Sequence, residues 1–232
     1  MQKLHPQTLE FLQGIDDFNE KKFFELYKPL YLNIKDEFEK FTQELIDEIA
    51  KFDKSFEKQE AKPCIFRIYK DMRRPKNRER PYKINMGASI TVGGRKSPLA
   101  GYYLHIQNGQ SFFCGGLRRP KSATAYPIRE HMYQEWETFK KIINKRTLKQ
   151  VFGSVSTSQD LLKKANRNSQ YSKILGTIPD EHPSLQYLAM KDWLRYKPLT
   201  NEEVLNEDFL EQCVEYAKIS SPSVQFINEA IV

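Results

Sequence analysis

The chain has 232 residues, of which 39% are hydrophobic and 12% aromatic, and its formal net charge at pH 7 is +7. Apolar residues are spread along the chain, which excludes intrinsic disorder, and no apolar run approaches the roughly 20 residues of a membrane-spanning helix. The N-terminal MQKLHPQTLEFLQG lacks the apolar core of a secretion signal. Three widely separated cysteines (Cys64, Cys114, Cys213) indicate buried thiols. We therefore expect a soluble cytoplasmic protein.

Residues 8–52 have the pattern of helices. A short helix is expected over 8–14, opened by Thr8, and a longer one over 20–51. In the longer segment apolar residues from Phe23 to Ile49 recur at three- and four-residue steps, as an amphipathic helix requires. Pro29 lies inside this pattern and predicts a kink or a division near Lys28.

Residues 64–116 change to a period of two, which is typical of strands. Seven of the ten glycines lie between Gly87 and Gly116, among short apolar runs. This pattern predicts an antiparallel meander of about four or more strands. Asn108-Gly109 predicts a hairpin, because both central positions of such a turn need a positive φ. Residues 93–97, GGRKS, are expected to form a turn between strands.

From Tyr126 to about residue 220 the pattern is helical again. We expect helices over 127–145, 158–167, 184–194 and 201–219. No repeat or long linker divides the chain. The predicted fold class is therefore α+β, a single domain over 1–232 in which helices from both ends of the chain pack on an antiparallel sheet.

The positive charge is concentrated in residues 67–83, RIYKDMRRPKNRERPYK, which contain eight cations and two anions. This segment carries a net +6 of the +7 of the whole chain. Two cations about 6 Å apart in a water-like medium repel by roughly 0.7 kcal/mol. Such a cluster therefore indicates a negatively charged partner.

A strand over residues 65–73 would place Arg67, Asp71 and Arg73 on one face at two-residue steps. An arginine fork binds phosphate or carboxylate with two bonds, each contributing roughly 1.5–3 kcal/mol. Asp71 could hold both forks in place, with their outer edges free for a ligand. The alternative is an ion-paired sheet surface followed by a solvated loop, RRPKNRERP.

Several segments resemble one family, the domain of unknown function 2461. The resemblance is carried by Arg67-Ile-Tyr-Lys-Asp71-Met-Arg73 with Pro81-Tyr82-Lys83-x-Asn85, and by TLEFLQGIDDFNEKKFFELYKPLY, GYYLHI, GGL, Ile128-Arg129 and HPSLQYLAMKDW. It implies a site formed by the matching positions, which are Arg67, Asp71, Arg73, Tyr82, Lys83 and Asn85. The chain departs from the family pattern at Lys70, usually Arg, and at Arg74, usually Phe. The loop PKNRER is about one residue longer than usual. The resemblance implies no ligand and no reaction.

Two further residues, His105 and Arg129, join Asp71 as candidates for chemistry. Asp71 and His105 are the candidates for proton transfer, although a strand histidine is more often a satisfied structural residue. Arg129 is a candidate anion ligand near the start of a helix, and its alternative is a surface arginine. No metal-ligand spacing and no cofactor motif is present, so we expect neither a metal nor a cofactor.

The sequence leaves three functions open. The first is binding of a small phosphate- or carboxylate-bearing ligand, with or without catalysis. The second is nucleic-acid binding through the basic stretch 67–83, with Tyr69 and Tyr82 available for base stacking. The third is recognition of acidic protein segments. A membrane partner is not expected, and the oligomeric state and any enzymatic turnover are left open.

Overall fold

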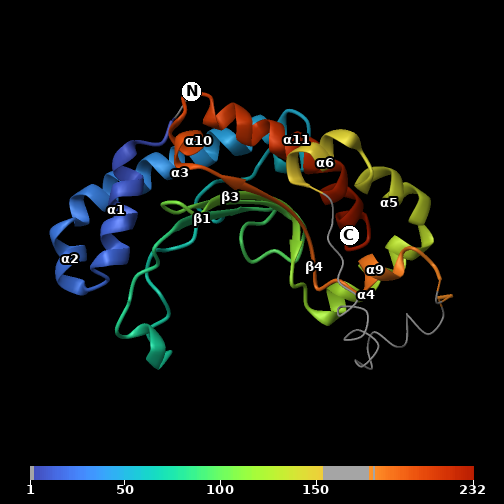
Figure 1. Ribbon diagram of the computed structural model, residues 1–232, viewed down its shortest axis with the longest axis horizontal. Coiled ribbons are helices and arrows are strands. Elements are labelled where there is room, and N and C mark those ends of the chain that lie inside the picture. Colours follow the sequence, from blue (N-terminus) through green and yellow to red (C-terminus); the bar gives the residue numbers. More distant parts are fainter. Residues whose placement is uncertain (1–2, 154–177, 180) are drawn as a thin grey trace. The chain divides into compact units, whose positions relative to one another are not determined.

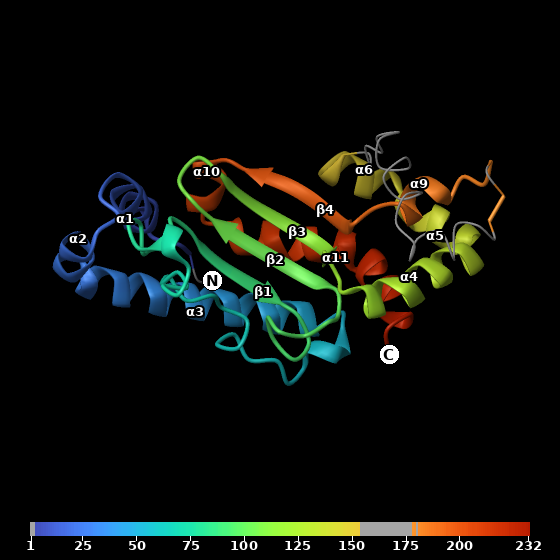
Figure 2. The same cartoon turned by 90° about the horizontal axis from the view of Figure 1, so that it is seen from below.

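The computed structural model describes residues 3–153, 178–179 and 181–232. The fold is α+β, as predicted, with helices and a four-stranded antiparallel sheet (Figure 1). The strands follow one another in the order β1-β2-β3-β4 (Figure 2). They are β1 (Met86–Ile90), β2 (Gly101–Ile106), β3 (Ser111–Arg118) and β4 (Asp192–Leu199). The predicted helix over 158–167 lies outside the described residues.

The chain forms two compact units, each assembled from several stretches of sequence. The first unit comprises Met1–Ser97, Tyr102–Cys114 and Lys197–Lys218. The second comprises Pro98–Gly101, Gly115–Tyr196 and Ile219–Val232. That the chain is a single domain stays a prediction.

The N-terminal helices of the first unit follow the sequence pattern closely. They are α1 (Pro6–Asp17), α2 (Lys21–Leu26) and α3 (Lys28–Ala50), so the expected long helix is divided at Tyr27. Pro29 lies in the first turn of α3, where the missing N–H has no helical partner to lose. The predicted division near Lys28 is therefore confirmed.

Residues of β2 from Tyr102 onward alternate between a buried and a half-buried face. Along β2, Tyr102, Leu104 and Ile106 are buried, whereas Tyr103 and His105 are half-buried on the other face. The buried face packs on helices: the Phe113 ring lies 5.8 Å from that of Tyr216 in α11 (Phe209–Glu229). Residues 107–110 form a turn at the predicted place, with φ +69° at Gly109, but Asn108 does not have the positive φ that was expected of it.

The expected strand over residues 65–73 is wrong. This stretch makes two isolated bridges, Ile65 with Ala88 and Tyr69 with Tyr82. Pro81 has no N–H, so the pairing between the two sides rests on Lys70 N–H donating to Pro81 O and Lys83 N–H donating to Ile68 O. We call residues 66–85 the basic arm. It extends away from the strands and carries a short 3₁₀ helix, η2 (Pro75–Asn77), at its far end (Figure 1).

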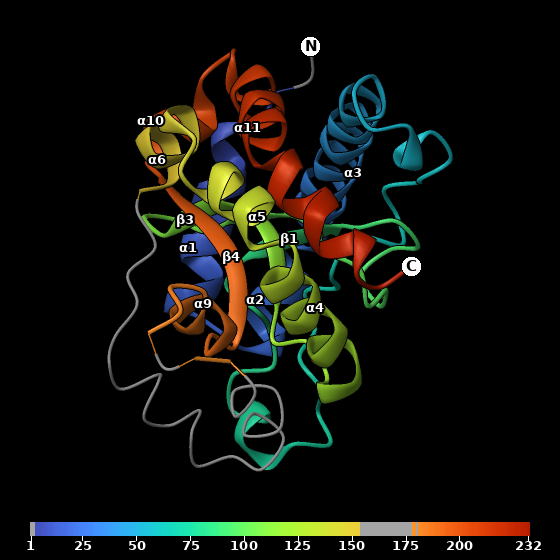
Figure 3. The same ribbon diagram turned by 90° about the vertical axis from the view of Figure 1, so that its right-hand side faces the viewer.

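The helices of the second unit differ from the prediction at two places (Figure 3). The helix expected over 127–145 begins earlier and is divided at Glu135 into α4 (Ser122–Gln134) and α5 (Trp136–Ile143). These are followed by α6 (Arg146–Phe152). The helix expected over 184–194 is the single turn α9 (Leu185–Leu188), and the chain then enters β4.

The predicted boundary of the sheet at residue 116 is therefore also wrong, because β4 lies far along the sequence. Trp193 and Arg195 are buried on one face of β4, while Tyr196 is exposed. Pro198 is tolerated because β4 is the last strand of the sheet and needs no second ladder of N–H donors. After β4, the helix expected over 201–219 is divided into α10 (Asn201–Leu205) and α11.

Candidate anion-binding site

The basic arm is fixed to the N-terminal helices through Tyr82. The Asn19 side chain accepts a hydrogen bond from Tyr82 N–H at 2.9 Å and donates one to Tyr82 O at 3.1 Å. The Tyr82 ring stacks on Phe24 at a centroid distance of 4.3 Å. Arg80 forms an ion pair with Asp16 of α1. Tyr82 thus anchors the arm and is itself 4% exposed.

Asp71 and Arg73 form a closed pair. Arg73 Nε and Nη2 donate to the two Asp71 carboxylate oxygens at 2.9 Å each, and Arg73 N–H donates to Oδ1. These bonds hold the pKa of Asp71 to about 2. Because residues 65–73 are not a strand, Arg67 does not share a strand face with this pair. The expected Arg–Asp–Arg face is not formed.

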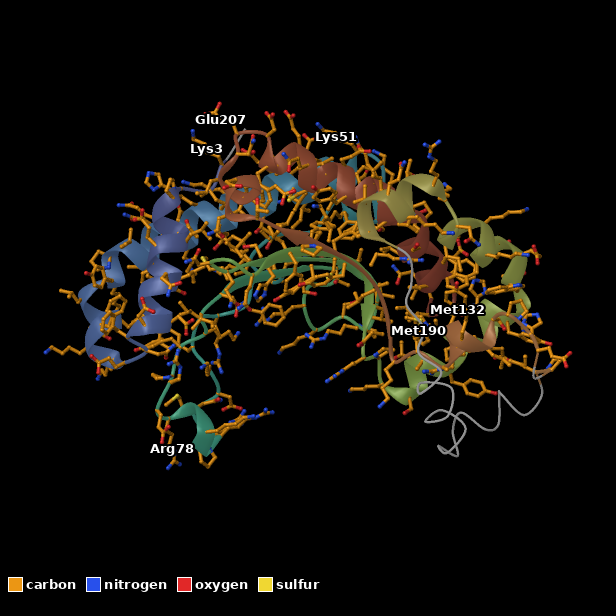
Figure 4. All side chains as sticks on the ribbon, in the orientation of Figure 1. Lys3, Lys51, Arg78, Met132, Met190 and Glu207 are labelled. Carbon is orange, nitrogen blue, oxygen red and sulfur yellow. The ribbon has the colours of Figure 1, made fainter. Side chains whose placement is uncertain are left out.

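The far end of the arm spreads its charges into solvent. Arg74, Lys76 and Arg78 are exposed, and Arg78 points away from the sheet (Figure 4). None of the three has an ion pair within the part of the chain that the structure describes. These three cations of the arm are therefore directed to solvent and have no carboxylate partner among the described residues.

A groove of about 400 Å³ lies between α3 and the base of the arm. Its lining is strongly positive: five cations (Lys28, Lys35, Lys62, Arg67, Arg95) and one anion (Glu39). The remaining lining is apolar, aromatic or amide (Tyr31, Leu32, Ile65, Phe66, Ile68, Tyr69, Asn85, Met86). The groove therefore combines unbalanced positive charge with a partly apolar wall.

Most of the groove cations have no ion pair with the residues that the structure describes. Lys28 Nζ lies 3.7 Å from Glu25 Oε2, and both side chains of this pair are exposed. Lys35, Lys62, Arg67 and Arg95 have no ion pair among the described residues. Three apolar side chains of the wall are also unusually exposed: Leu32 at 53%, Phe66 at 37% and Tyr69 at 43%.

Lys83 lies beside the groove, in contact with two of its lining residues. Its Nζ donates to Arg67 O at 2.8 Å and is 5.1 Å from the centre of the Phe66 ring. Burial, followed by the charges of Arg67 and Arg95, lowers the pKa of Lys83. The charges of Arg67 and Arg95 lower the pKa of Lys83 because nearby carboxylates do not neutralise them.

Arg95 reaches the groove from the turn after β1. Its backbone N–H and its Nη1 both donate to Pro63 O, at 3.2 and 2.9 Å. Gly94 permits this approach: its φ is +80°, and an added Cβ would lie 2.8 Å from a Pro63 side-chain atom. The turn predicted over 93–97 is present, with Ser97 N–H donating to Gly94 O.

Several groove residues were missed by sequence reasoning. Lys28, Leu32, Lys35 and Glu39 recur at steps of four, three and four, so they share one face of α3. An exposed leucine between two lysines on one helix face was a usable signal. Lys62 and Arg95 gave none, because their proximity depends on the tertiary fold.

His105 is satisfied within the sheet. With the Gln107 amide oxygen 3.0 Å from Nε2, this nitrogen carries the proton and Nδ1 accepts from Tyr103 Oη at 3.2 Å. Asn85 Nδ2 lies 3.4 Å from the same Nδ1. Burial lowers the pKa of His105. Both ring nitrogens are therefore engaged by neighbouring side chains.

Arg129 lies in the second unit and is 6% exposed. Its guanidinium donates to three backbone oxygens, those of Ala125, Leu188 and Met190. It also lies 4.9 Å from the Trp193 ring centre. Arg129 connects α4 to the segment before β4, which accounts for its burial without a ligand.

Residues 7–226 match the family described as "Conserved hypothetical protein (DUF2461)". The chain belongs to this family. No curated protein and no solved structure matches the chain. The family covers nearly the whole chain and thereby confirms the resemblance seen in the sequence.

The family-matching positions are thus divided among three places. Arg67 and Asn85 line the groove, with Lys83 beside them. Tyr82 anchors the arm, and Asp71 and Arg73 form an ion pair with each other.

Across the described ranges there is no group of three or more metal-ligating side chains. No helix in those ranges is long and apolar enough to span a bilayer.

Proposed function

We propose that the protein binds a small anionic ligand, bearing phosphate or carboxylate, in the groove between α3 and the basic arm. The observation that carries this proposal is the set of four groove cations without an ion pair among the described residues. Charges of one sign held around a concave surface favour an oppositely charged ligand.

Arg67 provides the fork that can bind a phosphate or carboxylate with two bonds, and Lys35 and Arg95 add charge from two other elements. Asn85 supplies an amide group, and Lys83 raises the local potential. Asp71 and His105 have their polar atoms engaged by neighbouring side chains. We therefore propose binding without assigning a catalytic step to either residue.

Thermal unfolding with inorganic phosphate, nucleoside phosphates and phosphorylated sugars tests the proposal. A ligand of the groove raises the Tm of the wild type, and Arg67→Gln weakens its binding by roughly 10-fold or more, as the loss of a charge-assisted bond requires. Arg78→Gln is the matched control, since it removes the same charge from the far end of the arm. Equal loss in both variants would show that net charge, and not the groove, binds the ligand.

Nucleic-acid binding is the second candidate, and the exposed Phe66 and Tyr69 rings beside the groove cations favour it. Stacking of a base on an aromatic ring contributes roughly 1–3 kcal/mol. For this candidate, affinity for short single-stranded oligonucleotides falls steeply with salt, and Phe66→Leu weakens binding at every salt concentration. Affinity that does not change with salt counts against it.

A further inference from the structure

A small cavity in the second unit is lined by a buried arginine that has no polar partner among the described residues. Arg195 of β4 is 7% exposed and lines this cavity of about 30 Å³. Within the described residues, its side chain has neither a hydrogen bond nor an ion pair. An arginine is always protonated in proteins, so a full positive charge is held at the cavity.

A second polar group without a partner in the described part of the chain lines the same cavity. Ser223 of α11 also lines it and is 6% exposed. Its Oγ is buried and has no hydrogen-bond partner in the described structure. A hydroxyl can donate to an anion that an arginine neutralises. The two unsatisfied groups come from separate elements, β4 and α11, and are therefore complementary to one ligand.

The remaining wall of the cavity is apolar. It includes Phe139 and Ile143 of α5, Trp193 of β4 and Ile227 of α11. Burial lowers the pKa of Arg195, and the neighbouring Tyr187 raises it by less. An anion beside a largely buried guanidinium offsets the cost of its lost hydration, so a counter-ion at this position stabilises the folded unit.

The size of the cavity limits the counter-ion. A buried water needs roughly 10–15 Å³ of such volume, so the cavity has space for about two waters. We propose that Arg195 and Ser223 bind one small monovalent anion, a halide or the carboxylate group of a formate-sized molecule. The site lies wholly within the second unit and is independent of the groove.

Thermal unfolding of wild type and Arg195→Met, titrated in parallel with sodium chloride and sodium formate, tests the site. Met keeps much of the side-chain length and removes the charge, so the variant reports general salt effects. At 100 times the dissociation constant, a bound anion raises the wild-type Tm by roughly 5–10 °C in a saturable manner. Arg195→Met shows no saturable rise. Identical titrations of the two proteins overturn the proposal, and the two salts distinguish a halide from a carboxylate.

Ser223→Ala and a bromide soak keep the test decisive if Arg195→Met does not fold. Loss of the Ser223 hydrogen bond weakens anion affinity by about 5- to 10-fold, whereas an uninvolved hydroxyl leaves affinity unchanged. In crystals grown with sodium bromide, an anomalous peak in contact with the Arg195 guanidinium and Ser223 Oγ is expected. Ordered water in the cavity without anomalous signal, together with a Ser223→Ala affinity equal to wild type, overturns the assignment.

Discussion

Arg129 and Arg195 lie in the same unit and are almost equally buried, at 6% and 7% exposure. Arg129 donates to three backbone oxygens and packs on the Trp193 ring. Arg195 is two residues further along the strand than Trp193 and has no polar partner among the described residues. The same residue type at the same depth is thus satisfied by the backbone in one place and left unsatisfied in the other.

Burial alone therefore does not distinguish an arginine that the fold satisfies from one that has no polar partner among the described residues. The same contrast is present at the surface. Arg73 of the arm forms an ion pair with Asp71, whereas Arg67 of the groove has no ion pair in the described chain. A guanidinium that the fold satisfies needs no ligand. A guanidinium without a polar partner in the fold is stabilised when an anion binds to it. Each prediction below tests one side of this contrast.

The largest expected effect is on Arg129. Replacement by Met leaves the oxygens of Leu188 and Met190 without their donor and removes the contact with Trp193. We expect a loss of about 3–5 kcal/mol in the free energy of unfolding, measured by urea denaturation. Arg146→Met, an exposed arginine of the same unit, is the control and should change stability by less than about 0.5 kcal/mol. A loss below about 1 kcal/mol for Arg129→Met would falsify the structural role given to this residue.

Arg195→Met, in contrast, should increase the free energy of unfolding when small anions are absent. Removal of an uncompensated buried charge and its replacement by an apolar side chain raises the free energy of unfolding by about 1 kcal/mol or more. The measurement is urea denaturation in a buffer of large organic ions. A loss of stability like that of Arg129→Met would mean that the protein itself satisfies Arg195, and the contrast between the two arginines would disappear.

The predictable parts of the structure are those set by neighbouring residues. Pro29 fixes the division between α2 and α3, and Gly109, with its positive φ, suits the turn between β2 and β3, because both effects act on backbone dihedrals nearby. β4 was not predicted: its first three residues lie within the helix expected over 184–194, and no element was expected over 195–199. The burial of Arg195 is a property of the tertiary packing that local patterns do not encode.

The candidate site divides along the same line. The basic stretch was visible as a charge cluster, and Arg67 and Asn85 could be identified by the family pattern. The groove also needs Lys35 and Arg95, which come from a helix and a turn 60 positions apart. The closure of Asp71 on Arg73 could not be foreseen either, because it requires the loop geometry that replaces the expected strand.

The paired arginine of the arm gives a prediction with a defined pH range. Arg73 holds the pKa of Asp71 to about 2, so Arg73→Ala should return it toward the ordinary value of about 3.9. Because the folded pKa is depressed, the pair contributes to stability above pH 4, and the contribution is lost as the pH falls toward 2. Carboxyl NMR titration measures the shift. The pair is exposed, so high salt should reduce it. An Asp71 pKa that stays near 2 in the variant would show that another group lowers it.

The smallest expected effect is on the pKa of Lys83, which lies beside the groove cations that have no ion pair in the described chain. The charges of Arg67 and Arg95 add to the burial that lowers its pKa. Arg67→Gln should therefore raise the pKa of Lys83, but only in part, because burial is the larger cause and is unchanged. An anion bound in the groove should raise it in the wild type for the same electrostatic reason. Lysine side-chain NMR follows both shifts, and Arg78→Gln should leave the Lys83 pKa where it is. If phosphate binds and the Lys83 pKa does not rise, the ligand lies outside the groove and the unpaired cations there are not its site.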